Sequence, residues 1–200
     1  MRQYTITKVT GNPDWSKIPS LDVDNYQWCQ ELDIKMKSQI CYDENGLYVH
    51  LRAWEKDIRA ELNAPMSMVC EDSCMEFFFR PVAEDLRYFN LEINPNGQMY
   101  IGFGPNMPEL VRLALQEEDQ LLQKKCNYTE DGCEVFYTFP VSVIRVFFPG
   151  YGLKSGMKIY ANSYKCGDEC VIPHFISWNK VEVPEPSFHQ PEHFGLMVLE

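Results

Sequence analysis

The sequence predicts an all-β fold: an antiparallel β-sandwich of jelly-roll or immunoglobulin-like type with one short crossover helix. Three observations support this fold class. Apolar and polar residues alternate in short segments, turn signals recur at short intervals, and only one stretch has helical spacing. The chain has 200 residues, of which 45% are hydrophobic and 14% aromatic, enough for one core. We therefore expect residues 1–200 to form a single domain.

The first hairpin is predicted over residues 37–54, around an Asn45-Gly46 turn. An Asn-Gly dipeptide between apolar segments favours a two-residue type I′ loop. That loop would place Tyr42 opposite Val49 and would keep apolar residues opposite apolar ones along both strands.

The next strand is predicted within EDSCMEFFFRP, residues 71–81. Side chains alternate between the two faces of a strand. The core face would carry Met75, Phe77 and Phe79, and the opposite face would carry Cys74, Glu76, Phe78 and Arg80. The second face is therefore expected to be partly polar. Asp72 and Ser73 either form the turn that begins this strand or contact a ligand directly.

A second hairpin is predicted over residues 88–104. A two-residue Asn96-Gly97 loop would mix apolar and polar residues on each face, whereas a three-residue loop from Pro95 to Gly97 keeps them apart. Gly97 would then take the left-handed conformation that such a loop needs. The predicted pairs are Phe89 with Phe103, Leu91 with Ile101, Ile93 with Met99, and Glu92 with Tyr100.

One helix, one long loop and five further strands complete the prediction. Residues 108–125 begin with proline and place leucines near one helical face, so we expect a helix that crosses between the sheets. The proline-rich residues 181–195 are expected to form a loop ordered by its aromatic rings. The remaining strands are predicted at residues 3–9, 133–139, 157–165, 174–179 and 195–200.

The charge and the cysteines restrict the function and the compartment. A net charge of −11 repels phosphate backbones, so we expect no nucleic-acid partner. No run approaches the ~18 apolar residues of a membrane span, so we expect no membrane partner. The start, MRQYTITKV, lacks the apolar segment of an export signal, which favours a cytoplasmic location; an extracellular one stays open if export uses another route. The eight cysteines are accordingly expected to be thiols.

Cys166, Cys170 and His174 recur at intervals of four in CGDECVIPH. Thiolate and imidazole are zinc ligands, but a structural zinc site usually has more closely spaced pairs and a fourth ligand. Two interpretations stay open: a zinc site, or a loop with ordinary thiols, which the missing fourth ligand favours.

Polar and aromatic side chains gather on the predicted non-core faces, and their mixture is typical of sugar binding. A pyranose has an apolar face that stacks on an aromatic ring and hydroxyls that need donors and acceptors. The candidates on these faces are Trp54, Arg52, Glu76, Arg80, Asn90, Glu92, Asn162 and Tyr164. The alternative is that these side chains simply pair with one another as surface or half-buried ion pairs.

No nucleophile elbow, phosphate-binding loop or HExxH motif is present, so no catalytic residue is assigned. We predict non-catalytic carbohydrate binding on the polar concave face of a sheet. The alternative is a glycoside-acting hydrolase, or an accessory subunit of one in carbohydrate catabolism, with Glu76 and Glu92 as acid and base. A third interpretation is an interaction surface covered by another chain, and the oligomeric state is left open.

Three segments carry a resemblance to a known family: EDSCMEFFFRP, RYFNLEINPNGQMYIGFG and HFISWNKVEVPEPSFHQPEHFGLMVLE. Together they resemble carbohydrate-binding module family nine, specifically its stand-alone bacterial relatives. The resemblance extends over nearly the whole chain. It implies a jelly-roll sandwich, sugar binding rather than sugar cleavage, and bound calcium as a possible cofactor. In xylanase-linked members it implies a terminal sugar held between two tryptophans.

The resemblance also assigns individual residues. Glu76 matches the acid of the family's DS..E strand, and Asn90 and Glu92 match polar contacts on the following strand. Asn162 matches the asparagine of the penultimate strand, and Trp178 matches the tryptophan of the SWN segment, which adds Trp178 to the candidate ligand-binding residues. The family's stacking tryptophan before DS is replaced here by Val69-Cys70. Trp54 on a neighbouring strand is the proposed substitute.

Overall fold

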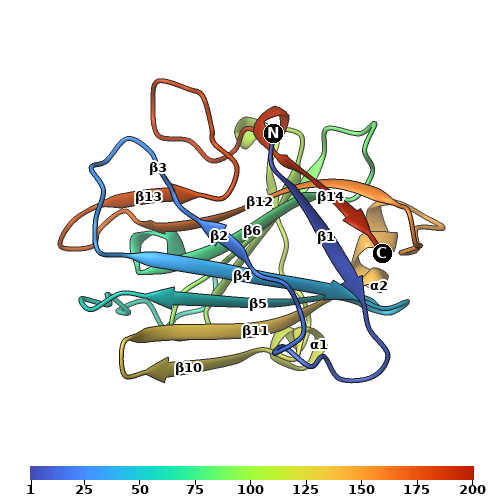
Figure 1. Ribbon diagram of the computed structural model, residues 1–200, viewed down its shortest axis with the longest axis horizontal. Coiled ribbons are helices and arrows are strands. Elements are labelled where there is room, and N and C mark those ends of the chain that lie inside the picture. The colour runs from blue at the N-terminus through green and yellow to red at the C-terminus, as the bar shows by residue number, and fades with distance from the viewer.

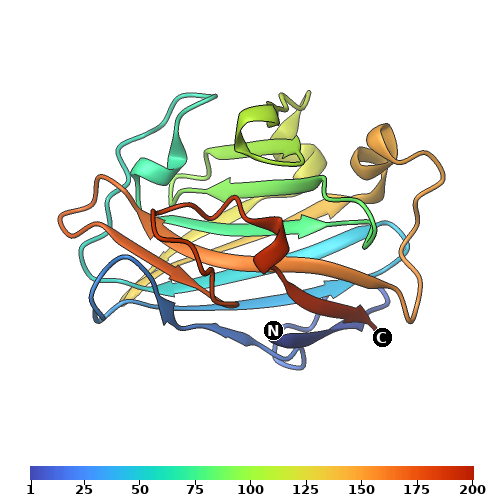
Figure 2. The ribbon, with the colours of Figure 1, turned by 90° about the horizontal axis from the view of Figure 1, so that it is seen from above.

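Two curved β-sheets stack face to face in the computed structural model, which describes residues 1–200 (Figures 1 and 2). Strand β1 (Gln3–Lys8) joins them, because its first residues pair with β14 (Gly195–Leu199) and its last two pair with β4 (Lys35–Tyr42). Both of these pairings are parallel, and the other strand pairings are antiparallel. The predicted antiparallel β-sandwich is confirmed.

The sheet that faces the viewer in Figure 1, called the front sheet, has the order β10-β11-β5-β4, with β2 also paired to β4. Its further strands are β2 (Leu21–Val23), β5 (Gly46–Trp54), β10 (Lys125–Thr129) and β11 (Gly132–Pro140).

The second sheet, called the back sheet, has the order β14-β12-β6-β7-β8-β9, and β13 pairs with both β12 and β3. Its further strands are β3 (Asn25–Tyr26), β6 (Cys74–Arg80), β7 (Tyr88–Ile93), β8 (Met99–Gly104), β9 (Val111–Arg112), β12 (Lys158–Gly167) and β13 (His174–Ser177). The short 3₁₀ turns are η1 (Val69–Glu71), η2 (Met107–Glu109) and η3 (Pro191–His193).

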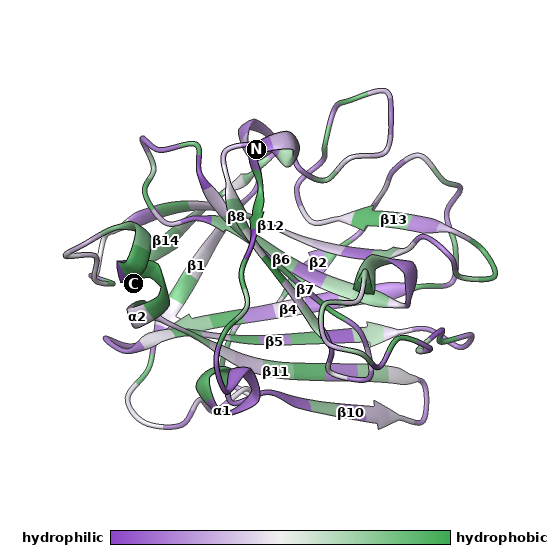
Figure 3. Ribbon diagram, turned by 180° about the vertical axis from the view of Figure 1, so that it is seen from behind, coloured by the Kyte–Doolittle hydropathy of each residue, from purple (hydrophilic) through white to green (hydrophobic).

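The main hydrophobic core fills the space between the two sheets. Alternation along β6 sends Met75, Phe77 and Phe79 into this core, as predicted, where they join residues of β5 such as Leu51. The same period is visible in Figure 3, where hydrophobic and hydrophilic segments alternate along β5. A second, smaller cluster that includes Phe78 lies on the outer face of the back sheet, so that face is only partly polar.

The two predicted hairpins have different outcomes. The β7–β8 register agrees residue for residue with the three-residue loop, and Gly97 has the expected positive φ of 82°. The β4–β5 register is shifted by two residues, with Tyr42 opposite Leu47 rather than Val49.

The shift in the β4–β5 hairpin has a local cause. Asp43 Oδ1 accepts hydrogen bonds from the backbone N–H groups of Asn45 at 2.7 Å and Gly46 at 3.2 Å, so the turn tightens around Glu44 and Asn45. Gly46 belongs to β5, and a Cβ there would lie 2.7 Å from the carbonyl oxygen of Phe139. The glycine is therefore needed for close strand packing rather than for the loop.

The predicted helix over residues 108–125 is wrong. The segment forms part of η2, then strand β9, and only the five-residue helix α1 (Glu118–Leu122). The N–H of Leu113 donates to the carbonyl of Ile101 at 2.8 Å, so this backbone pairs with the edge of β8 instead of forming helical hydrogen bonds. Sheet pairing thus outweighs helical propensity here. A second short helix, α2 (Val141–Phe147), follows β11 and was not predicted.

All eight cysteines are unpaired, in agreement with the prediction of thiols. The two α-helices have five and seven residues, and no helix has the length and apolar character needed to cross a bilayer.

Candidate functional site

The outer face of the back sheet holds a cleft whose floor is built from two adjacent carboxylates. Glu76 of β6 and Glu92 of β7 are directly opposite each other in the strand register, so both side chains leave the sheet on the same face. They are only 3% and 6% exposed, yet both line a cleft of about 350 Å³. We call this site the carboxylate cleft.

Aromatic and thioether side chains form the walls of the carboxylate cleft. The lining residues besides the two glutamates are Trp28, Met68, Cys70, Tyr100, Met107, Cys166, Asp168, Phe175, Pro186, Ser187, Phe188 and His189. Trp28 follows β3, at one end of the strand order, and Tyr100 belongs to β8, near the other end. The strands that carry the carboxylates lie between them, so an acidic floor separates two aromatic rings.

Both aromatic rings are held by their neighbours. Trp28 has a left-handed backbone with φ of 56°, and its indole N–H donates to the carbonyl of Val183 at 2.9 Å. Its ring packs edge-on against Phe175, with a centroid distance of 6.0 Å. The guanidinium of Arg112 lies 4.1 Å from the centroid of the Tyr100 ring, so a cation–π contact fixes that ring. These contacts make the walls rigid before any ligand binds.

The carboxylates in the floor bind protons more tightly than free carboxylates do. Burial, followed by repulsion from Glu92, raises the pKa of Glu76 well above its usual value. Burial also raises the pKa of Glu92 to about 7. The Cys166 thiol donates to Glu76 Oε1 at 2.9 Å, and the Asn90 amide donates to Glu92 Oε1 at 2.6 Å. A protonated carboxyl group beside an ionised one would let this floor both donate and accept hydrogen bonds.

The proline-rich loop, residues 181–195, forms one side of the carboxylate cleft, and aromatic stacking orders it as predicted. Phe188 stacks on Tyr164 of β12 at 4.1 Å between ring centroids, and the Tyr164 hydroxyl donates to the Phe188 carbonyl at 3.2 Å. His189 forms a 2.8 Å hydrogen bond with the Tyr88 hydroxyl, and burial lowers the pKa of His189 to about 4. Tyr164 therefore packs between the sheet and the loop and is fully buried.

Of the nine predicted binding residues, the structure places only Glu76 and Glu92 in this cleft. Asn90 lies on the same face, but it is buried and acts through its hydrogen bond to Glu92. Arg80 lies at the end of β6, where it donates to the backbone carbonyls of Ala83 and Asp85. It orders the following turn instead of facing a ligand.

Trp178 and Asn162 are structural, which corrects their assignment as ligand contacts. Trp178 is 3% exposed and belongs to the core between the sheets. Its indole packs so closely on Gly195 that a Cβ there would approach it to 2.4 Å. Asn162 is buried, accepts from the Asn179 N–H at 2.8 Å and donates to the Asn179 carbonyl at 2.8 Å. This pair fixes the chain after β13.

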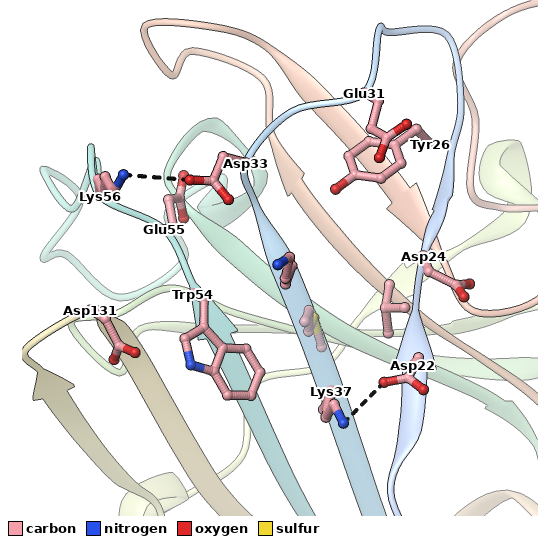
Figure 4. A pocket seen from close by; sticks show the side chains of 13 residues that line it. Asp22, Asp24, Tyr26, Glu31, Asp33, Lys37, Trp54, Glu55, Lys56 and Asp131 are labelled. Atoms are coloured by element: carbon pink, nitrogen blue, oxygen red, sulfur yellow. Dashed lines mark hydrogen bonds and ion pairs between the residues drawn. The ribbon is translucent and has the colours of Figure 1, made fainter.

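Trp54 and Arg52 lie on the outer face of the front sheet, on the other side of the core from Glu76. The alternation along β5 turns them away from the core, and Arg52 stacks over Trp54 at 4.7 Å. Figure 4 shows the second cleft that Trp54 lines, called the Trp54 cleft, whose volume is about 600 Å³.

Two of the lysines that line the Trp54 cleft form ion pairs with aspartates of the same cleft. Lys37 lies 3.3 Å from Asp22, and Lys56 lies 3.4 Å from Asp33, as the dashed lines in Figure 4 mark. These are exposed ion pairs, the alternative considered for the polar faces as a whole. Because Trp54 lies on the outer face of the opposite sheet, it cannot replace the missing tryptophan of the Glu76 site.

Sequence reasoning missed Trp28, Asp168, His189 and the two methionines of the cleft, and it left Tyr100 out of the candidate set. These residues except Tyr100 come from loops and turns, where strand alternation gives no orientation. The available signal was Trp28 itself, an indole in a polar connection, DNYQWCQE.

Asp72 and Ser73 form a buried turn rather than a ligand contact. Asp72 accepts hydrogen bonds from the backbone N–H groups of Glu61 and Leu62 and pairs with Arg59. Ser73 accepts from the Arg59 N–H at 2.9 Å. The turn interpretation of this dipeptide is therefore confirmed.

Two clusters of side chains bring potential metal ligands together. Glu55, Cys170 and His174 form one, and Cys74, Glu76 and Cys166 form the other. The structure keeps Cys170 and His174 together, as the sequence grouping has them, but places Cys166 in the second cluster. Each cluster contains thiols or an imidazole, whereas calcium takes six to eight oxygen ligands. Neither fits calcium, and calcium binding stays a prediction.

The fold and the carboxylate cleft define a class of protein: a β-sandwich module with an aromatic-walled cleft on the outer face of one sheet. The sequence matches the model of carbohydrate-binding family 9 over residues 7–199. The chain belongs to this family. No curated protein matches it.

Solved structures show the same fold. A protein from Bacteroides uniformis that carries a provisional carbohydrate-binding name has 25% sequence identity and a TM-score of 0.88, with 100% of this chain and 99% of that chain covered. A family 9 carbohydrate-binding module from Caldicellulosiruptor kristjanssonii, solved with glucose, has 13% identity and a TM-score of 0.70, and 100% of this chain and 96% of that chain are covered. The same module with cellotriose gives the same identity and TM-score, with 100% and 94% covered.

Proposed function

We propose that this protein binds a saccharide, without cleaving it, in the carboxylate cleft. The observation that carries the proposal is the placement of two fixed aromatic rings, Trp28 and Tyr100, around a floor of two buried carboxyl groups, Glu76 and Glu92. Membership in carbohydrate-binding family 9 supports the ligand class. So do the glucose and cellotriose complexes of the Caldicellulosiruptor module.

The chemistry of the cleft matches the two surfaces of a sugar ring. An indole or phenol ring stacks on the apolar C–H face of a pyranose, and carboxyl groups bond to the hydroxyls at its edge. The volume of about 350 Å³ lies near the lower limit of small-molecule sites, about 300–1,000 Å³. We therefore propose a mono- or disaccharide unit as the ligand in the cleft.

The arrangement of the two acids favours binding over hydrolysis. Glycoside hydrolases place their two carboxyl groups on either side of the scissile bond. Here Glu76 and Glu92 stand side by side in one floor, because they are direct neighbours in the β6–β7 register. A hydrolase would turn over aryl glycosides and lose that activity in Glu76→Gln, whereas the binding proposal predicts no turnover.

Calorimetric titration with glucose, cellobiose and cellotriose tests the proposal. Loss of a stacking ring typically costs about 1 kcal/mol beyond its buried area, so we expect Trp28→Ala to weaken binding by about tenfold or more. Glu76→Gln keeps the size of the side chain and should weaken binding as well, because it replaces one acceptor oxygen of the carboxyl group with an NH2 group that can only donate.

Trp54→Ala is the matched control, because it removes an indole from the opposite side of the sandwich. Its affinity should equal that of the wild type. Absence of heat with each of these sugars, together with no perturbation of Trp28 fluorescence by a wider panel, would overturn the proposal. So would an affinity that falls in Trp54→Ala and not in Trp28→Ala.

A further inference from the structure

Two neighbouring cysteines on the outer face of the back sheet have no role in the saccharide proposal, and one of them, Cys166, lines the carboxylate cleft. Cys74 of β6 and Cys166 of β12 are direct neighbours across the two strands, and both side chains are on the face that carries Glu76. Their sulfur atoms and a Glu76 oxygen all lie within 4.8 Å of one another. The Cys166 sulfur is 2.9 Å from Glu76 Oε1.

We propose that Cys74, Cys166 and Glu76 form a binding site for a zinc-like divalent transition-metal ion. Two thiolates and a carboxylate are ligands that such an ion takes, at about 2.3 Å for sulfur and about 2.0–2.2 Å for oxygen. Around a tetrahedral ion these lengths put two sulfur atoms about 3.8 Å apart, which the observed convergence allows. Calcium does not take thiolates, so the site belongs to a different class of metal.

The charge balance of the cleft also favours a cation. No ion pair neutralises the carboxyl groups of Glu76 and Glu92: the hydrogen-bond partners are the Cys166 thiol for Glu76 and the Asn90 amide for Glu92. Burying adjacent acids without a counter-charge is costly unless protons or a cation compensate them. Bound to both thiolates and to Glu76, a divalent cation would balance two of their three negative charges.

The other potential metal cluster provides an internal contrast. Glu55 and His174 surround the ammonium group of Lys165, whose Nζ lies 3.0 Å from Glu55 Oε2 and 2.8 Å from His174 Nε2. That cluster therefore already contains its own cation. The Glu76 cluster has no such lysine, although its ligand atoms converge to the same degree.

Three protein ligands leave one tetrahedral position open, as in zinc sites that bind an exchangeable water or ligand. Glu76 and Cys166 line the carboxylate cleft, so the open position faces it. The metal site does not depend on the saccharide assignment. Binding would release the two thiol protons, together with the proton of the Glu76 carboxyl group, into solvent, leaving two thiolates and a carboxylate bonded to the ion.

Titration of the reduced, metal-free protein with Co²⁺ alone tests the site. Thiolate coordination gives a sulfur-to-cobalt charge-transfer band, and tetrahedral geometry gives intense d–d bands in the visible. We expect both bands at one equivalent, bleached by one equivalent of Zn²⁺. Cys74→Ser and Cys166→Ser should each weaken binding by more than about tenfold and remove much of the charge-transfer intensity.

Two matched variants separate this site from other thiols. Cys126→Ser changes a thiol on β10, and Cys170→Ser changes the cluster around Lys165; both should keep the bands. Absence of the bands in the wild type, or their loss in Cys170→Ser with retention in Cys74→Ser, would overturn the inference. Because no sugar is present, either result leaves the saccharide proposal to its own titration.

Discussion

His189 provides the sharpest quantitative prediction, because one cause sets its protonation. It lies in the proline-rich loop at the carboxylate cleft, where its neighbours are the Tyr88 hydroxyl at 2.8 Å and the rings of Tyr88 and Phe78. Burial lowers its pKa from 6.5 to about 4. The folded protein therefore holds His189 neutral at pH values where the unfolded chain is protonated.

The sign and the size of the effect follow from proton linkage. Between the two pKa values the unfolded state binds more protons, so the free energy of unfolding falls as the pH falls from about 6.5 to about 4. From about pH 7.5 to about pH 5 this histidine should cost about 2 kcal/mol of stability. The full difference, reached below the folded pKa, is about 3 kcal/mol.

Urea unfolding followed by tryptophan fluorescence at both pH values measures the effect. Other groups titrate too, so the quantity to compare is the loss of stability in the wild type minus the loss in His189→Gln, which should be about 2 kcal/mol. Equal losses in both proteins would refute the reasoning. They would mean that the loop opens and hydrates His189 in the native state.

Two further predictions concern buried residues, Trp178 and Lys165. Trp178→Ala should lower the free energy of unfolding by about 3–5 kcal/mol, because it empties a core position. Under conditions in which the variant is fully folded, its sugar affinity should equal that of the wild type. Chemical denaturation with a parallel sugar titration checks this, and a stable variant that cannot bind sugar would contradict it. Lys165→Met should cost about 3–5 kcal/mol, because it leaves the buried carboxylate of Glu55 without its cation. Recovery of stability in the double variant Lys165→Met with Glu55→Gln, measured by the same denaturation, is expected; failure to recover would show that the ion pair is not the cause.

The strand pattern was accessible from the sequence because it depends on local alternation. The facing of Phe77 and Phe79 into the core and the β7–β8 register follow from a period of two and from a glycine with positive φ. The predicted β4–β5 register is wrong because Asp43 accepts a side-chain hydrogen bond within the turn, and this bond outweighs the preference of Asn-Gly for the loop positions. The predicted helix is wrong because the backbone of this segment forms hydrogen bonds with the edge of β8 instead of helical ones.

The sequence by itself determined the sandwich, the family and the pair of acids, Glu76 and Glu92, that share one face. Only the tertiary structure decided which sheet each aromatic residue belongs to. Alternation tells whether a side chain points in or out, but a sandwich has two outer faces, and sequence does not say which is which. Trp54 therefore lies on the outer face of the front sheet, and Trp178 lies in the core between the sheets. Trp28 lines the carboxylate cleft from a loop whose orientation depends on contacts with residues distant in the chain.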